Sequence, residues 1–190
     1  MERDLQHYFA KHVVRSRSET ELVWAEPNTG INLIRYTIVA ERYLVVTGDL
    51  GDAIYLWSCP LRFQWLSGLS LSYFAEKCQA SENGRGNRSW CSKRCRKNIL
   101  AYAEELEANE REQVIELLKG AGDVIDNEHA WAFWADDNLR EFWEDMEGIS
   151  DAGRVISTRC ELHLLGLRMA MQQIDAAQKS TAEGGEKAGA

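Results

Sequence analysis

The feature that most constrains the fold is a series of strand-like segments joined by short turns. The chain reads TELVWAE, INLIRYTIVA, RYLVVTG and AIYLWS in succession, and LRFQWL is a candidate fifth strand. These segments are rich in β-branched and aromatic residues, and several alternate apolar with polar side chains. Parallel neighbours need a crossover of a dozen or more residues, which these connections do not provide. We therefore predict an antiparallel β-meander over residues 20–66.

The chain changes character after this region, because helical periodicity replaces alternation. Ser70 or Ser72 can cap a helix that reaches Cys78, and further helical stripes run over residues 90–121 and from residue 150. When strands come first and helices are segregated after them, the fold is α+β rather than a doubly wound parallel sheet. The predicted fold class is therefore α+β, with an N-terminal antiparallel β-meander followed by a mainly helical C-terminal half.

Three regions are expected from this pattern. Residues 1–84 would contain a short helix over residues 4–14, the meander and the helix that follows it. Residues 85–178 would form a helical region. Residues 179–190 contain no large apolar side chain, so we expect a disordered tail there.

The composition excludes several classes of protein. The chain has 190 residues, of which 45% are hydrophobic, and a formal net charge of −8, as is typical of globular proteins. No apolar run approaches the roughly 20 residues that a membrane span needs, and the charged N-terminus lacks the features of a secretory signal. We therefore expect a protein of the cytoplasm of a host cell, without a membrane partner, whose five cysteines are free thiols.

The sequence GDLGD, residues 48–52, invites interpretation as a ligand-binding loop. A phosphate-binding loop leads into a helix, whereas the AIYLW that follows here is typical of a strand. A calcium loop needs more oxygen ligands than Asp49 and Asp52 supply. Gly48 and Gly51 permit positive φ angles, and the two aspartates can bond the turn backbone. The pattern favours a hairpin turn.

The residues around this turn also carry a resemblance. TGDLGDAIYLWS followed by LSYFAEKCQASENG resembles a group of small bacteriophage and prophage proteins, in which a VTGD-G-AIY-W hairpin precedes a YFA-KC-A helix. The likeness covers about residues 35–84. It implies a phage accessory protein, a class that includes inhibitors of host defences such as anti-CRISPR proteins. It implies no catalytic residue in this chain.

The charge is distributed unevenly along the chain. Residues 104–147 contain 15 acidic and three basic residues, a net charge of −12, so the remainder carries about +4. Within this region, HAWAFWADDNLREFWEDMEG combines aromatic and acidic side chains. Such aromatics more often belong to a core, but aromatics ringed by carboxylates also suit a basic protein partner. The candidate partner-binding residues are Trp131, Trp134, Asp136, Asp137, Glu141, Glu144 and Asp145.

A basic segment, RGNRSWCSKRCRK, precedes the acidic region. Its six bases beside Trp90 suit contact with the phosphates and bases of a nucleic acid. The alternative is a solvated helix start that pairs with the acidic half of the chain. The candidate nucleic-acid-binding residues are Arg85, Arg88, Lys93, Arg94, Arg96 and Lys97.

The cysteines allow a zinc hypothesis. Cys91 and Cys95 are spaced C-x3-C, Cys78 lies upstream, and Cys160 and His163 form the ends of CELH. Four such ligands can bind zinc, but zinc ribbons and fingers usually show two tight ligand pairs, and buried or idle thiols are the simpler interpretation. Since idle thiols are the simpler interpretation, we expect no metal or other cofactor. The basic neighbours of Cys95 predict that the pKa of its thiol is lowered.

No catalytic motif is present among those that identify nucleophilic, zinc-protease or phosphate-loop enzymes. The leading hypothesis is a non-enzymatic, phage-encoded inhibitor of the anti-CRISPR type. It would bind a host protein or nucleoprotein complex with a basic surface, using its own acidic helical surface. The alternatives are a regulatory protein that binds nucleic acid through residues 85–97, and an unrecognised metal-dependent enzyme.

Overall fold

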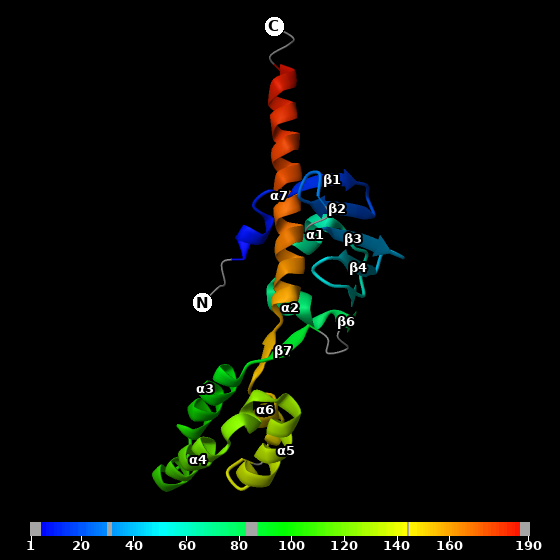
Figure 1. Cartoon of the computed structure of the whole chain (residues 1–190). Coiled ribbons are helices and arrows are strands. Elements are labelled where there is room, and N and C mark those ends of the chain that lie inside the picture. Colours follow the sequence, from blue (N-terminus) through cyan, green and yellow to red (C-terminus); the bar gives the residue numbers. More distant parts are fainter. Residues whose placement is uncertain (1–4, 30–31, 83–86, 144, 187–190) are drawn as a thin grey trace. The chain divides into compact units, whose positions relative to one another are not determined.

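The computed structural model describes residues 5–29, 32–82, 87–143 and 145–186, and the chain forms two compact units. Unit 1 comprises residues 1–87 and 156–190, and unit 2 comprises residues 88–155. Figure 1 shows the elements of both units along the sequence. An N-terminal antiparallel sheet precedes a mostly helical C-terminal half, so the predicted α+β class is confirmed.

Unit 1 contains a six-stranded sheet whose strand order follows the chain, with every neighbouring pair antiparallel. Such an order is a meander, as the short turns predict. The elements of unit 1 are η1 (Gln6–Phe9), β1 (Val13–Arg17), β2 (Glu21–Ala25), β3 (Ile34–Val39), β4 (Tyr43–Gly48), β5 (Ala53–Leu56), α1 (Phe63–Ser67), α2 (Leu71–Glu76), β6 (Cys78–Ser81) and α7 (Thr158–Glu186).

Unit 2 is mainly helical, and its first and last strands pair with each other as a separate two-stranded sheet. Its core contains Ile99 of one helix, Val114 of the next and Trp131 of a third. The elements are β7 (Arg88–Trp90), α3 (Ser92–Ala103), α4 (Ala108–Gly120), η2 (Gly122–Asp126), α5 (Glu128–Leu139), α6 (Met146–Ser150) and β8 (Arg154–Ile156).

The segment LRFQWL is a helix, α1, and the predicted fifth strand is wrong at this position. Phe63 and Leu66, three residues apart, are buried, whereas Gln64 and Trp65 between them are exposed. That spacing is one helical turn rather than the alternation of a strand. The aromatic content favoured a strand, but the burial pattern of the folded unit requires a helix.

Four strands were not predicted from the sequence: β7, β8, which lies where a helix from residue 150 was expected, and the two edge strands of the sheet, β1 and β6. Val13 and Val14 begin β1 instead of ending a helix over residues 4–14, where only the short η1 forms. Cys78 begins β6 instead of ending a helix. Both edge strands pair with a neighbour, Val14 opposite Trp24 and Ala80 opposite Ile54. Pairing at the edges of the sheet, which the local sequence does not encode, therefore makes both segments strands rather than helices.

Helix α7 packs on one face of the sheet and completes the core of unit 1 (Figure 1). The Tyr36 hydroxyl on β3 donates a hydrogen bond of 2.9 Å to the His163 carbonyl of α7. Gly166 allows the closest approach, because a Cβ there would lie 2.6 Å from the Tyr36 hydroxyl oxygen. The helix buries an apolar stripe against the sheet: Leu164, Leu167, Met171 and Ile174.

This packing differs from the predicted division into residues 1–84, 85–178 and 179–190. The last helix belongs to unit 1, because its apolar stripe is buried in the core around the sheet. It continues to Glu186, into the segment expected to be a disordered tail. The two connections to unit 2 leave unit 1 at one place, where the Ser157 N–H donates a hydrogen bond of 2.7 Å to the Asn87 carbonyl.

Among the residues that the structure describes, no helix combines the length and apolar character required to span a bilayer.

The close approach at Gly166 leads to a stability prediction. Gly166→Ala should lower the free energy of unfolding by about 1–3 kcal/mol, because overpacking forces side chains or backbone to shift. Urea denaturation measures the change. Gly68→Ala is the matched control in the same unit, since the nearest atom to its added Cβ lies at 3.5 Å. Equal stability of the two variants would contradict the packing of α7 on the sheet.

Candidate functional site

An open groove of about 540 Å³ lies on the surface of unit 2. One helix, α4, forms one wall, and α5 with the residues just after it forms the other. Its floor is apolar, since Leu117, Trp134 and Phe142 are half-buried and pack against the core of unit 2. Glu116 and Glu141 are exposed at its rim. The lining residues are Gln113, Glu116, Leu117, Gly120, Trp134, Asn138, Glu141 and Phe142.

The wall on α4 is positioned by a capping box and by core packing. The Glu107 side chain accepts from the backbone of Glu110, whose side chain in turn accepts from the Glu107 N–H at 3.2 Å. This exchange satisfies amides that the start of a helix leaves unpaired. Val114 and Leu118 face the core. Gln113 and Leu117, each one position before a buried residue, therefore lie on the side of α4 that lines the groove.

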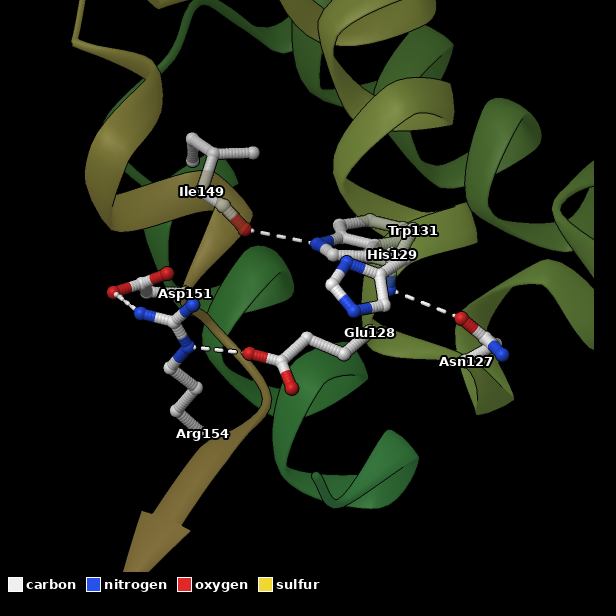
Figure 2. Close-up of polar contacts among 7 residues, drawn as sticks. All are labelled: Asn127, Glu128, His129, Trp131, Ile149, Asp151 and Arg154. Atoms are coloured by element: carbon white, nitrogen blue, oxygen red, sulfur yellow. Dashed lines mark hydrogen bonds and ion pairs between the residues drawn. The ribbon is translucent and has the colours of Figure 1, made fainter. Parts of the chain in front are cut away.

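The wall on α5 begins at an N-cap and is anchored by a buried tryptophan. The Asn127 side chain accepts hydrogen bonds from the backbone N–H groups of His129 and Ala130, at 3.0 and 3.1 Å. Trp131 is fully buried and donates from its indole nitrogen to the Ile149 carbonyl at 2.9 Å (Figure 2). Pinning Trp131 in the core sets the rotation of α5, so that Trp134 lines the groove.

Arg154 on β8 holds the start of this helix in place. Its guanidinium donates to Glu128, in the first turn of α5, at 2.5 Å and to Asp151 at 2.6 Å (Figure 2). The hydrogen bond with Glu128 is the main cause that raises the pKa of Arg154 above its usual value. A cation shared by two carboxylates thus links β8 to the N-terminus of α5 and to the end of α6.

The predicted partner-binding residues differ in their surroundings, since some line the groove and others are buried or paired. Trp134 and Glu141 line the groove, whereas Trp131 is buried and cannot reach a partner, which corrects its place in the predicted set. Asp136 is paired with Arg140 on α5, and Asp137 is exposed beside it. A second hollow of about 540 Å³ is lined by Asp136, Asp137, Asn138, Arg140 and Glu141.

Two further acidic residues complete that set. Asp145 caps α6, since its carboxylate accepts from the Glu147 N–H at 2.9 Å, so it has a structural role at an exposed position. Glu144 lies outside the described residues. The structure therefore brings Trp134, Asp136, Asp137 and Glu141 to neighbouring hollows on one helix and its C-terminal extension.

The basic segment is divided between exposed and engaged side chains. Arg88 is exposed on β7, and Lys93, Arg94 and Lys97 are exposed on α3. Arg96 is half-buried and donates to the carbonyls at the end of α4 and start of η2, those of Leu118 at 3.0 Å and Gly122 at 3.5 Å. Arg96 thus holds α3 and α4 together rather than facing a ligand. Arg85 lies outside the described residues.

The candidate zinc ligands are not brought together. In the described part of the chain, no three His, Cys, Asp or Glu side chains meet in a metal-binding arrangement. Cys78 lies on β6 of unit 1, whereas Cys91 and Cys95 lie at the start of α3 in unit 2. Burial raises the pKa of the Cys95 thiol to about 12, and the nearby Arg96 opposes this only in part. The predicted lowering of this pKa is therefore wrong.

The GDLGD segment forms the turn between β4 and β5. Gly48 and Gly51 have φ angles of 132° and 89°, which other residues rarely adopt. The Asp49 carboxylate accepts from the Leu33 N–H at 3.0 Å, and that of Asp52 accepts from the Gly48 N–H at 3.2 Å. The hairpin turn is as predicted, and Asp52 bonds its backbone, whereas Asp49 instead bonds the residue that precedes β3.

A buried histidine connects this turn to α7. His163 Nε2 lies 3.0 Å from the Gly51 carbonyl, which can only accept, so Nε2 carries the proton. Nδ1 is then the acceptor for the Tyr55 hydroxyl at 3.0 Å. Burial lowers the pKa of His163 to about 4, so the ring is neutral at pH 7. CELH is therefore a structural element of unit 1, with Cys160 also fully buried.

The sequence analysis missed the α4 wall of the groove. Leu117 was visible as part of a helical stripe, and the spacing of Gln113, Glu116, Leu117 and Gly120 places them on one helix face. That spacing was the available signal. It could not distinguish Glu116 from its many acidic neighbours, because only the packing of α4 beside α5 makes this face part of a groove.

Comparison of the chain with protein-family models, with curated proteins and with solved structures yields no match in any of the three.

The buried histidine leads to a pH prediction. The unfolded chain binds a proton at His163 near pH 6.5, whereas the folded chain does so only near pH 4, so stability falls as pH decreases between these values. Between pH 7.5 and 4.5 this group should cost about 2.5 kcal/mol of unfolding free energy. Urea denaturation at both values should show a smaller loss for His163→Gln than for the unchanged chain. The same loss in both proteins would contradict the neutral, buried state of His163.

Thiol burial leads to a reactivity prediction. Cys59 is exposed, whereas burial raises the pKa values of Cys95 and Cys160 to about 12 and keeps their thiols protonated. Iodoacetamide at pH 8 should therefore alkylate Cys59 in the folded protein and reach the other two only after denaturation. Peptide mass spectrometry measures each site. Rapid labelling of Cys95 in the folded chain would contradict this prediction, because it would mean that the basic neighbours affect the pKa of this thiol more strongly than burial does.

Proposed function

We propose that this protein is a non-enzymatic binding protein that engages a basic segment of a protein partner through the α4–α5 groove of unit 2. The observation that carries the proposal is the composition of the groove. Leu117, Trp134 and Phe142 form an apolar floor, and Glu116 and Glu141 stand at its exposed rim. Desolvated aromatic anchors surrounded by a polar rim are the usual form of a protein-binding hot spot.

The charge of the region determines the kind of partner. Residues 104–147 carry a net charge of −12, and the second hollow beside the groove adds Asp136 and Asp137. A negative potential around an apolar site attracts Lys- and Arg-bearing partners and repels acidic ones, including nucleic acids. The basic segment, residues 85–97, is less suited than the groove to be the binding surface, because Arg96 donates to carbonyl groups inside unit 2.

This function suits the role that the hairpin resemblance implies, which is a phage accessory protein acting on a host defence. An acidic surface can occupy a basic channel built for phosphates, because both present spaced negative charge to Lys and Arg. We therefore extend the proposal to inhibition by occupancy, in which the partner is a host protein or nucleoprotein complex with a basic surface and no reaction is catalysed.

Selection of peptides tests the proposed function. Random peptides displayed on phage and selected on the intact protein should become enriched in Lys and Arg. Glu116→Lys combined with Glu141→Lys should weaken the selected peptides by about tenfold, because two rim charges change from attraction to repulsion. Glu104→Lys combined with Glu105→Lys is the matched control, since these residues are exposed in the same unit but do not line the groove.

Calorimetric titration of the selected peptides measures both effects. Absence of basic enrichment, or equal weakening by the groove and control variants, would contradict the proposal. The second outcome would mean that the peptides bind through the overall negative charge of the chain rather than in the groove.

A further inference from the structure

One wall of the groove is a helical stripe, and the other combines one helical turn with the residues that follow it. Gln113, Glu116, Leu117 and Gly120 follow the spacing i, i+3, i+4, i+7 on α4, whereas the opposite wall has Trp134 and Asn138 on α5 and Glu141 and Phe142 in the turn after it. At a rise of 1.5 Å per residue, the α4 stripe extends over about 10 Å, the length of two helical turns. The groove therefore follows two turns of α4 rather than enclosing a single group.

The walls offer few backbone groups to a ligand. Most N–H and C=O groups of α4 and α5 bond within their own helix, the Phe142 N–H donates to the Leu139 carbonyl, and the Asn138 amide donates to the Trp134 carbonyl at 2.8 Å. An extended peptide in this groove would lack ladder partners for its own backbone, which is costly on burial. A helix satisfies its backbone internally and packs its side-chain ridges into the groove between two others.

The floor has room for bulky apolar side chains. The open groove has a volume of about 540 Å³, which leaves space for more than one side chain of a partner. Gly120 is exposed, and a Cβ added there would meet no atom within 4 Å. The gap over Gly120, three residues from Leu117 on the same helix face, can therefore receive an anchor side chain of the partner.

We propose that the occupant of the groove is a basic amphipathic α-helix of a protein partner. Over two turns it would place apolar side chains on Leu117, Trp134 and the gap at Gly120. Its Lys or Arg side chains would meet Glu116 and Glu141 at the rim. This inference rests on the proposed function, because it specifies the partner of the same groove.

Two synthetic peptides of identical composition test the inference. Each has about 14 residues of Leu, Lys, Ala and Gln, roughly four helical turns. One peptide places Leu on one helical face and Lys on its flanks, and the other alternates Leu and Lys as a strand would. Calorimetric titration against the full chain should show about tenfold tighter binding of the helical pattern. Circular dichroism should show that this peptide gains helix when bound.

A groove-filling variant provides the site-specific control. Gly120→Phe should weaken the helical peptide by about tenfold, because the new ring occupies the gap. Ala101→Phe should leave binding unchanged, since Ala101 is exposed on α3 in the same unit and does not line the groove. Should Gly120→Phe fold poorly by circular dichroism, Gln113→Trp fills the other end of the same stripe from an exposed position.

The outcomes separate this inference from the proposed function. Equal affinity for both peptides, or no effect of either groove-filling variant, overturns the helical occupant. In that case the proposed function still stands if selected basic peptides depend on Glu116 and Glu141. Failure of both synthetic peptides to bind also overturns the helical occupant, while a lack of basic enrichment in the selection overturns the proposed function itself.

Discussion

The packing of α7 on the sheet is the interaction on which unit 1 depends. The inner face of the meander presents large side chains, including Tyr36, Leu44 and Tyr55, that are fully buried in a core to which α7 and the shorter α1 and α2 contribute. The absence of a side chain at Gly166 brings helix and sheet within direct contact. Burial of apolar area is the main source of stability in such a layer, and the buried hydrogen bonds from Tyr36 and Tyr55 set its alignment.

The arrangement of unit 2 depends on polar contacts between short elements rather than on one long helix. Its helices are short, so a few polar contacts determine how they meet. Trp131 bonds the Ile149 carbonyl, Trp90 bonds the Ile125 carbonyl, and Arg154 joins two carboxylates. Because α5 is positioned by these contacts on its inner face, its opposite side is free to carry exposed aromatic and acidic residues. The same helix thus contributes to the core and to the proposed binding surface.

Local patterns predicted those elements whose side chains alternate or repeat clearly. In β3, Ile34, Tyr36 and Ile38 are buried and Arg35 is exposed, as alternation requires, and Ser70 caps α2 as expected. The return of α7 to the sheet could not be predicted, because its bond to Tyr36 joins residues 127 positions apart. Nothing local records such a contact.

The candidate site was predictable on one side only. The aromatic and acidic composition of α5 indicated a binding surface, and Trp134 and Glu141 do line a groove. The distinction between Trp134 and the buried Trp131 depends on the rotation of the helix, which core packing sets. Glu116 and Gly120 on the facing wall gain their importance only from the position of α4 beside α5.

The hydrogen bond between Ser157 and Asn87 has a consequence for the sequence of unit 2. The chain leaves unit 1 and re-enters it at one point, so unit 2 is connected as an insertion within a loop of unit 1. Domains tolerate such insertions because the backbone on either side keeps its own contacts. Unit 2 can therefore change in sequence without disturbing the packing of the sheet against α7, so that the proposed choice of partner and the stability of the scaffold are set by separate parts of the chain.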